Sequence, residues 1–270
     1  MKNAHTMPGF LVAMIAAACA VQAQAQDNEE NLARQLANPV AALIRVAIQF
    51  NYNQNLGPRD DGEQWVLNFQ PVIPFTLNSN WNLISRTIFS AVDQSGIFPG
   101  SGSQSGLADT TQSLFFSPAA PTAQGLIWGV GPVFLLPTGT DDLLSTEKWG
   151  AGPTAVALIQ RGQWTVGLLG NHVWSFAGDD DRADVDATFI QPFVTYTTPT
   201  AWSYTLTSES TYNWEESEWG IPLRGAVSKV VRIGTQLASV GGAATYWAEP
   251  TANGPEEWSV RATITLLFPR

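Results

Sequence analysis

Trp258-Ser-Val-Arg-Ala-Thr-Ile-Thr-Leu-Leu-Phe-Pro-Arg270, the carboxyl end of the chain, is the stretch that decides the fold. Apolar side chains fall at every second position from Val260 to Phe268, and all but one of the positions between them are polar. This period of two predicts a β-strand with one apolar and one polar face. A strand of this kind, with an aromatic residue near its carboxyl end, is typical of the last strand of an outer-membrane β-barrel.

The amino-terminal residues have the pattern of a cleaved signal peptide. Lys2 precedes an apolar run at residues 10–21, and small residues at Ala23 and Ala25 offer two cleavage sites. This run of about 12 residues is shorter than the roughly 20 that a membrane-spanning helix needs, which argues against an uncleaved anchor. We therefore predict that residues 1–25 direct export and are removed.

The composition excludes several classes of protein. The chain has 13 basic and 23 acidic residues and a net charge of −10, which argues against a nucleic-acid-binding surface. The single cysteine, Cys19, lies in the signal segment and lacks the Leu that precedes a lipid-attachment site, so disulfide and thiol chemistry are not expected. Charged residues make up only 13% and aromatic residues 11%, with 11 Trp, as expected of a protein whose outside faces lipid.

The residues that follow the signal show no linker that would divide them into domains. Residues 26–42 are expected to form a periplasmic leader with a short amphipathic helix at 28–37, because acidic residues come first and Leu32 and Leu36 lie four apart. The sequence favours a frayed leader over the alternative, a periplasmic plug or cap. Residues 43–270 are expected to form the barrel.

From residue 43 onward the chain repeats one unit, a stretch of roughly 10 residues with period-two polarity followed by a turn or loop. Short turns alternate with longer polar loops, and the even count of about 12 strands fits a membrane barrel. The expected strands are 43–54, 64–75, 81–92, 110–117, 126–136, 149–160, 164–176, 185–197, 202–213, 219–230, 235–248 and the final stretch from 258. The loops expected outside the cell are 93–109, 137–148, 178–184, 215–218 and 249–257.

A soluble β-sandwich also has many strands joined by turns, so the pattern alone leaves that alternative open. Strand length favours a membrane barrel, since the units approach the ~9–11 residues needed to cross a bilayer at a tilt. Tryptophans near strand ends, from Trp65 to Trp258, are expected in an aromatic girdle. Prolines inside the strands disturb the predicted register; these are Pro71, Pro132, Pro153 and Pro192.

Six phrases resemble, in the same order, a bacterial outer-membrane transporter family whose members are often mislabelled "neuromedin U"; they are more distantly similar to the family named for the MetA pathway of phenol degradation. The resemblance covers nearly the whole mature chain and implies a barrel in the outer membrane with a transport role, and it brings no catalytic residues. The phrases are Asn38-Pro-Val-Ala-Ala-Leu-Ile44, Asn68-Phe-Gln-Pro-Val-Ile-Pro-Phe75, Trp81-Asn-Leu-Ile-Ser-Arg-Thr87, Gly129-Val-Gly-Pro-Val-Phe-Leu-Leu-Pro-Thr138, Asn171-His-Val-Trp-Ser175 and Thr265-Leu-Leu-Phe-Pro-Arg270.

Polar positions on the strands are the candidates for the lumen, because a barrel of about 12 strands is too wide for side chains to fill. Arg and Glu facing each other there would form a constriction that sorts solutes by charge, or would only pair to stabilise a closed barrel. The candidates are Arg45, Gln49, Asn68, Gln70, Arg86, His172, Glu209, Arg224, Lys229 and Arg261.

Two other sites compete with a pore. His172 would be the one histidine of the mature chain, and a partner such as Ser208 or Ser210 on another strand would make a hydrolase. The acidic loop 178–184 could bind calcium, although its spacing lacks a complete calcium-loop pattern and a solvated loop is favoured. The sequence predicts no catalytic residues, no metal and no cofactor.

We expect an exported, bacterial outer-membrane barrel, not an enzyme, that lies in the lipid bilayer with lipopolysaccharide and moves small solutes passively. The abundance of Trp and Phe also permits a hydrophobic or aromatic solute. The alternatives are a non-conducting scaffold barrel and, less favoured, a hydrolase. Because Pro269 and Arg270 follow the last aromatic residue, the barrel-assembly machinery is expected to recognise Phe268 at an internal position.

Overall fold

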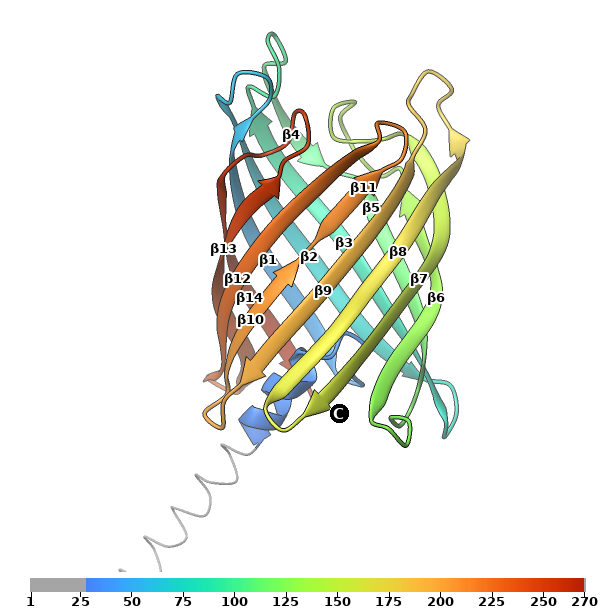
Figure 1. Ribbon diagram of the computed structural model, residues 1–270, viewed down its shortest axis with the longest axis vertical. Helices are drawn as coiled ribbons and strands as arrows, with labels where there is room; N and C mark the ends of the chain where they lie inside the picture. Colours follow the sequence, from blue (N-terminus) through green and yellow to red (C-terminus); the bar gives the residue numbers. More distant parts are fainter. Residues whose placement is uncertain (1–27, 270) are drawn as a thin grey trace, which may run out of the picture.

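The chain forms a closed antiparallel β-barrel of 12 strands (Figure 1). The structure, a computed structural model, describes residues 28–269, so the predicted signal peptide lies outside the described residues. The sheet has 14 segments because β4 and β5 flank Asp109, and β10 and β11 flank Glu209, each pair forming one barrel strand. The segments are β1 (Ile44–Leu56), β2 (Gly62–Thr76), β3 (Trp81–Ser95), β4 (Ser103–Leu107), β5 (Thr110–Pro118), β6 (Leu126–Leu136), β7 (Lys148–Arg161), β8 (Trp164–Gly178), β9 (Asp186–Thr197), β10 (Trp202–Ser208), β11 (Ser210–Asn213), β12 (Glu218–Ile233), β13 (Gln236–Glu249) and β14 (Trp258–Phe268).

The barrel closes where the first strand pairs with the last. The ladder between β1 and β14 runs from Ile44 opposite Phe268 to Tyr52 opposite Val260. Closure leaves no sheet edge with unpaired backbone groups, which is what a strand structure needs inside a bilayer. The fold class expected from the sequence is therefore confirmed.

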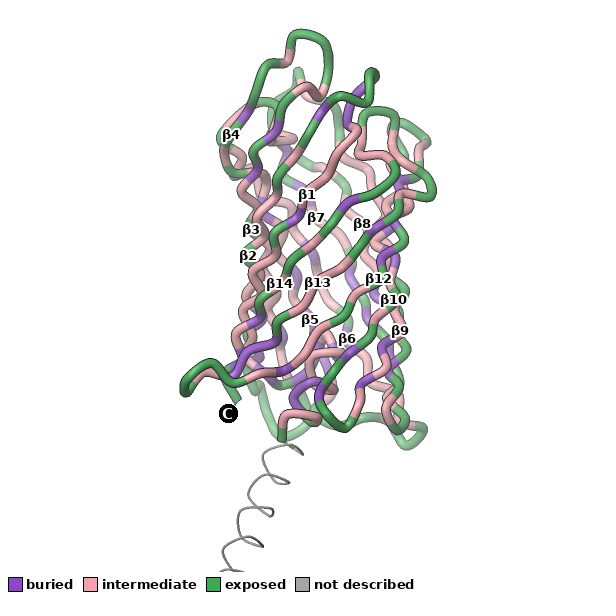
Figure 2. The backbone as a smooth tube through the Cα atoms, turned by 90° about the vertical axis from the view of Figure 1, so that its left-hand side faces the viewer, coloured by how far each residue is buried: buried purple, intermediate pink, exposed green. Residues whose placement is uncertain are grey.

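The wall has an apolar outer face and a mostly polar inner face, as the period of two predicts. Figure 2 shows the matching alternation of exposed and less exposed positions along the strands. On β14, Val260 and Ile264 lie exposed on the outer face, while Thr265 and Leu267 point inward and are buried. Aromatic rings gather on the outer face near strand ends and pair across neighbouring strands, as Tyr246 and Trp258 do at 5.3 Å. No helix among residues 28–269 is long and apolar enough to cross a membrane.

Several strand boundaries differ from the prediction, and the two largest differences extend a strand into an expected loop or turn. The expected loop 93–109 contains the end of β3 and all of β4, and the expected turn 231–234 contains the end of β12. Ser and Gln make up most of the added stretch of β3 and β4, whereas the added end of β12 is Val231-Arg-Ile233. The four prolines singled out in the sequence do not shift the register: the β2–β3 ladder, for example, skips Pro71 and resumes with the same pairing, because a missing N–H removes one bond without adding a residue. The β12–β13 ladder does shift by one residue, at Pro222.

The amino-terminal segment is packed against the barrel, so its preferred interpretation as a frayed leader is wrong. A helix at residues 28–36 lies at the end of the barrel that carries the short turns (Figure 1). Leu32 and Ala33 are buried in one cluster with inward-facing Val230 and Leu267. Val40, just after the helix, is buried with a second set of inner-wall side chains, among them Phe115. The segment thus narrows this mouth.

Candidate functional site

A chamber lies inside the barrel, between the amino-terminal segment and the middle of the wall. Its volume is about 330 Å³. Ala33, Leu36, Ala37 and Pro39 of the amino-terminal segment form part of its lining, and most of the rest comes from inward-facing positions of the strands. Among residues 28–269, the lining consists of small, polar and charged side chains with a few aliphatic ones, and it includes no aromatic ring.

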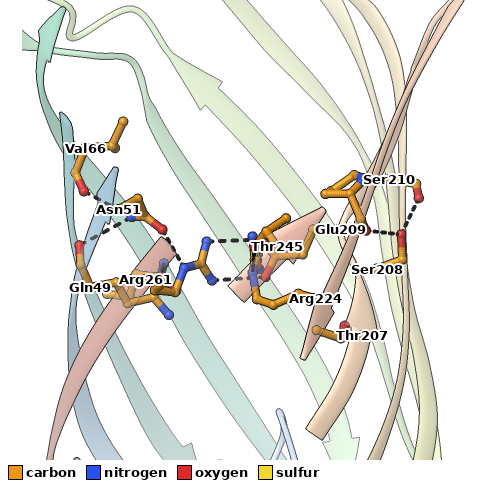
Figure 3. Close-up of polar contacts among 12 residues, drawn as sticks. Gln49, Asn51, Val66, Thr207, Ser208, Glu209, Ser210, Arg224, Thr245 and Arg261 are labelled. Carbon is orange, nitrogen blue, oxygen red and sulfur yellow. Dashed lines mark hydrogen bonds and ion pairs between the residues drawn. The ribbon is translucent and has the colours of Figure 1, made fainter. Parts of the chain in front are cut away.

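A charged layer crosses the lumen at one side of this chamber (Figure 3). Glu209 lies between two arginines: its Oε2 is 2.6 Å from Nη1 of Arg224, and its Oε1 is 3.3 Å from Nη1 of Arg261. Arg261 extends from β14 past β13 and β12 to Glu209, and its Nε donates to Asn51 Oδ1 on the neighbouring strand β1. Nε of Arg224 donates to Thr245 Oγ1 at 2.9 Å. These contacts fix both guanidinium planes.

Glu209 occupies its position because the backbone ladder is incomplete around it. Pro192 on β9 and Pro222 on β12 stand beside this strand, and neither has an N–H to donate. Side chains take over the nearby carbonyls: Thr207 Oγ1 donates to Pro192 O at 2.9 Å, and Ser208 Oγ donates to Pro222 O at 2.7 Å. The break between β10 and β11 follows, with Glu209 directed into the lumen.

Two further arginines face the chamber from the first strands. Arg45 donates from Nη1 to Asn38 O and from Nη2 to Pro39 O, each at 3.0 Å, and so holds the amino-terminal segment against the wall. Arg86 has one weak contact, from Nη2 to Gln70 Oε1 at 3.4 Å. Neither forms an ion pair with a carboxylate in the described part of the chain. Within residues 28–269, the chamber is therefore lined by four arginines and a single carboxylate, that of Glu209.

Amide side chains line the inner wall beside these arginines. Gln70 Nε2 donates to Gln49 Oε1 at 2.9 Å, and both residues line the chamber. Asn68, two residues from Gln70 and so on the same face, accepts a hydrogen bond from Ser90 at 2.7 Å. Eight of the ten predicted lumen residues therefore face inward; these are Arg45, Gln49, Asn68, Gln70, Arg86, Glu209, Arg224 and Arg261.

The two remaining candidates face outward, and their placement in the lumen was wrong. Lys229 is five residues from inward-facing Arg224, so a strand places it on the other face. Its ammonium lies 5.1 Å from the centre of the outward-facing Trp202 ring. His172 is three residues from inward-facing Leu169, and its ring contacts Trp174 on the outer face at 3.9 Å between centroids.

The contacts of His172 also bear on the hydrolase alternative. Its Nδ1 is 2.7 Å from Thr188 Oγ1 and its Nε2 is 3.0 Å from Asp186 Oδ1. The proposed partners Ser208 and Ser210 hydrogen-bond to each other instead, at 2.7 Å. The structure therefore brings neither serine to His172.

Asp184 of the acidic loop 178–184 binds a lysine and a serine of the neighbouring strands. Asp184 is 3.1 Å from Lys148 Nζ and accepts from Ser175 at 3.0 Å. The hydrogen bond from the Lys148 ammonium, with that from Ser175, holds the pKa of Asp184 below its usual range. Residues 28–269 contain no group of three His, Cys, Asp or Glu side chains placed to hold a metal ion.

One anchoring residue was not predicted from the sequence. Asp109, between β4 and β5, accepts from Ser145 Oγ at 2.6 Å and from both the backbone N and Oγ1 of Thr146 at 2.7 Å. It ties the loop before β7 to the barrel rim. Ser145 and Thr146 lie 36 and 37 positions after Asp109 in the sequence, so no local pattern predicts this contact. The one sequence signal is a Ser-Thr pair just before the start of a strand.

Comparison with known proteins supports the fold. No family model and no curated protein matches the chain. Among solved structures, an outer membrane channel from Pseudomonas putida F1 superposes with a TM-score of 0.66 and 15% identity, over 84% of this chain and 96% of that one. The fold is that of an outer-membrane β-barrel. At this identity the likeness shows fold alone, and the resemblance to the mislabelled transporter family stays a prediction.

Two more distant structures share the barrel form. The KdgM porin, solved with oligogalacturonate, has a TM-score of 0.47 and 10% identity, over 83% of this chain and 99% of that one. The β domain of the Bordetella autotransporter BrkA has a TM-score of 0.45 and 13% identity, over 83% and 99%. These similarities are too low to bear on function.

Proposed function

We propose that this protein is an outer-membrane channel for the passive movement of small polar solutes. One observation carries the proposal: the closed barrel has an apolar, aromatic-rich outside and a polar lumen that keeps a chamber of about 330 Å³. A barrel that served only to hold itself together could fill its centre with packed side chains, and an enzyme would need a grouped nucleophile and base.

The same features support a place in the outer membrane. An outward apolar band flanked by aromatic rings suits a bilayer with lipopolysaccharide in its outer leaflet. The predicted cleavage of residues 1–25 would deliver the chain to the periplasm. Phe268 is exposed on the outer face of β14, the closing strand, where the barrel-assembly machinery could bind it.

The chamber favours polar over aromatic solutes. The exposed aromatic side chains of the barrel strands face outward, and none lines the chamber in the described part of the chain. The amino-terminal helix narrows the mouth at the short turns, so solutes would pass beside it or displace it.

Solute flux into liposomes tests this function. The mature protein is reconstituted, and swelling in small neutral solutes is compared with that of two variants. Ala243→Trp places a large ring in the chamber and is expected to reduce the flux several-fold, because Ala243 lines it. Ala244→Trp places the same ring on the outer face of the same strand and is expected to leave the flux unchanged.

Folding is verified by heat-modifiable migration on gels. Absence of flux from a folded wild-type barrel would contradict the proposal and favour the scaffold alternative. Equal flux from wild type and Ala243→Trp would show that solutes do not use this lumen.

A further inference from the structure

The chamber has more positive charge than its own side chains neutralise. Arg45, Arg86, Arg224 and Arg261 face it, and Glu209 is the one carboxylate in its described lining. A charge removed from bulk water is costly unless an opposite charge or several hydrogen bonds compensate it. Among the described residues, three of these positive charges therefore lack a protein counter-charge.

Arg86 is the most available of these cations. Arg224 and Arg261 share Glu209, and Arg45 donates to two backbone carbonyls. Arg86 makes a single contact of 3.4 Å, to the amide oxygen of Gln70, which leaves its other guanidinium hydrogens for an occupant. Gln49 holds the amide of Gln70 in place from the neighbouring strand.

The protein itself shows which chemical group fits this environment. Glu209 presents a carboxylate, and two guanidinium groups bind it from different strands, with Arg261 contacting both of its oxygens at 3.3 and 3.4 Å. Planar guanidinium groups form paired hydrogen bonds with carboxylate and phosphate oxygens and give less selectivity for a spherical ion. The small residues around the chamber leave room for such a group.

From this charge balance and geometry we propose that the chamber is a binding site for a small oxyanion, a carboxylate or a phosphate, held by Arg86 in the positive field of Arg224 and Arg261. The inference deepens the proposed function, on which it rests for the route of entry. It assigns the channel anionic solutes, for which this site lies on the path.

Binding is measured first, without any need for conduction. The folded mature protein in detergent is titrated with succinate and with inorganic phosphate by calorimetry, at constant ionic strength, and glycerol serves as the neutral probe. We expect saturable binding of at least one oxyanion and none of glycerol. Arg86→Gln is expected to weaken binding about tenfold or more, since it removes a charged hydrogen-bond donor.

Two variants make this result specific. Arg59→Gln applies the same change outside the chamber, at a residue that pairs with Asp61 in a loop, and is expected to leave affinity unchanged. Arg86→Lys keeps the charge and loses the planar pair of donors, so its affinity should fall between wild type and Arg86→Gln. If Arg86→Gln does not give a heat-modifiable barrel, Arg86→Lys against Arg59→Gln decides the comparison.

Conduction separates the two proposals. A folded protein that binds succinate or phosphate but passes no current would overturn the channel and keep the binding site. A conducting protein that binds neither oxyanion, or whose affinity is equal in wild type and Arg86→Gln, would overturn the binding site and keep the channel. Preference for succinate over phosphate, or the reverse, identifies which oxyanion the site accepts.

Discussion

Replacing Glu209 by Gln should destabilise the barrel and change its lumen charge at the same time. Glu209 is the common partner of Arg224 and Arg261, at 2.6 and 3.3 Å. Gln has nearly the same shape but no charge, so the variant leaves two cations without a carboxylate while packing is preserved. Repulsion between the two guanidinium groups then opposes their present arrangement.

The size of the effect follows from burial. Breaking a buried ion pair by removing one partner costs ~3–5 kcal/mol. The side chains of Arg224 and Arg261 are 9% and 14% exposed, but that of Glu209 is 27% exposed, so water weakens the interaction. We therefore expect a loss near the lower limit, roughly 3 kcal/mol, which is more than a hundredfold in the unfolding equilibrium.

Denaturant unfolding in lipid vesicles, followed by the fluorescence of the 11 Trp, measures this loss. Glu215→Gln is the matched control, because Glu215 lies exposed in the loop between β11 and β12, and surface substitutions usually change stability by less than about 0.5 kcal/mol. Equal unfolding free energies for the two variants would refute the argument that the Arg–Glu–Arg layer stabilises the barrel.

Three other outcomes are expected. Arg45→Gln removes both hydrogen bonds from Arg45 to the amino-terminal segment, and a loss of about 2 kcal/mol would favour displacement of this segment roughly thirtyfold. Single-channel records should then show a larger share of time at high conductance; unchanged records would contradict the idea that Arg45 holds the segment in place. The Lys148–Asp184 pair contributes stability that is full above the unfolded carboxyl pKa of ~4 and is lost as pH falls through the lower folded pKa. Amide protection factors in loop 178–184, taken relative to the intrinsic exchange rate at each pH, should therefore be lower at pH ~3 than at pH ~7, while Asp184→Asn should show low protection at both. Lys229→Gln should leave the reversal potential in a salt gradient unchanged, because this side chain lies on the outer face; a shift of the reversal potential would place it in the lumen.

The period of two carried most of the fold prediction. The alternation of Ile48 and Phe50 with Gln49 and Asn51 identifies the inner face of β1 from the sequence alone, and the structure confirms that assignment. The same rule excludes Lys229 from the face that carries Arg224, because the two residues are separated by an odd number of positions, five. Lys229 was placed in the lumen because it is polar, without checking on which face of the strand its position falls. His172 was misplaced for the same reason.

Contacts between residues far apart in the sequence could not be predicted from it. The contact of Glu209 with Arg261 joins residues 52 positions apart, and neither strand register is visible in sequence. The packing of Leu32 and Val40 in the barrel depends on how wide the mouth is, which no local pattern reports. The anchoring role of Asp109 likewise depends on a loop that folds back 36 positions later.

Single-channel current across a planar bilayer tests the central claim, that this lumen is a conducting path narrowed by its amino-terminal segment. The mature chain is compared with a variant that lacks residues 28–37, both shown to be folded by heat-modifiable migration. The account predicts discrete openings from the mature chain and larger, steadier ones from the shortened variant. Silence from both folded proteins, or equal conductance of the two, would contradict it.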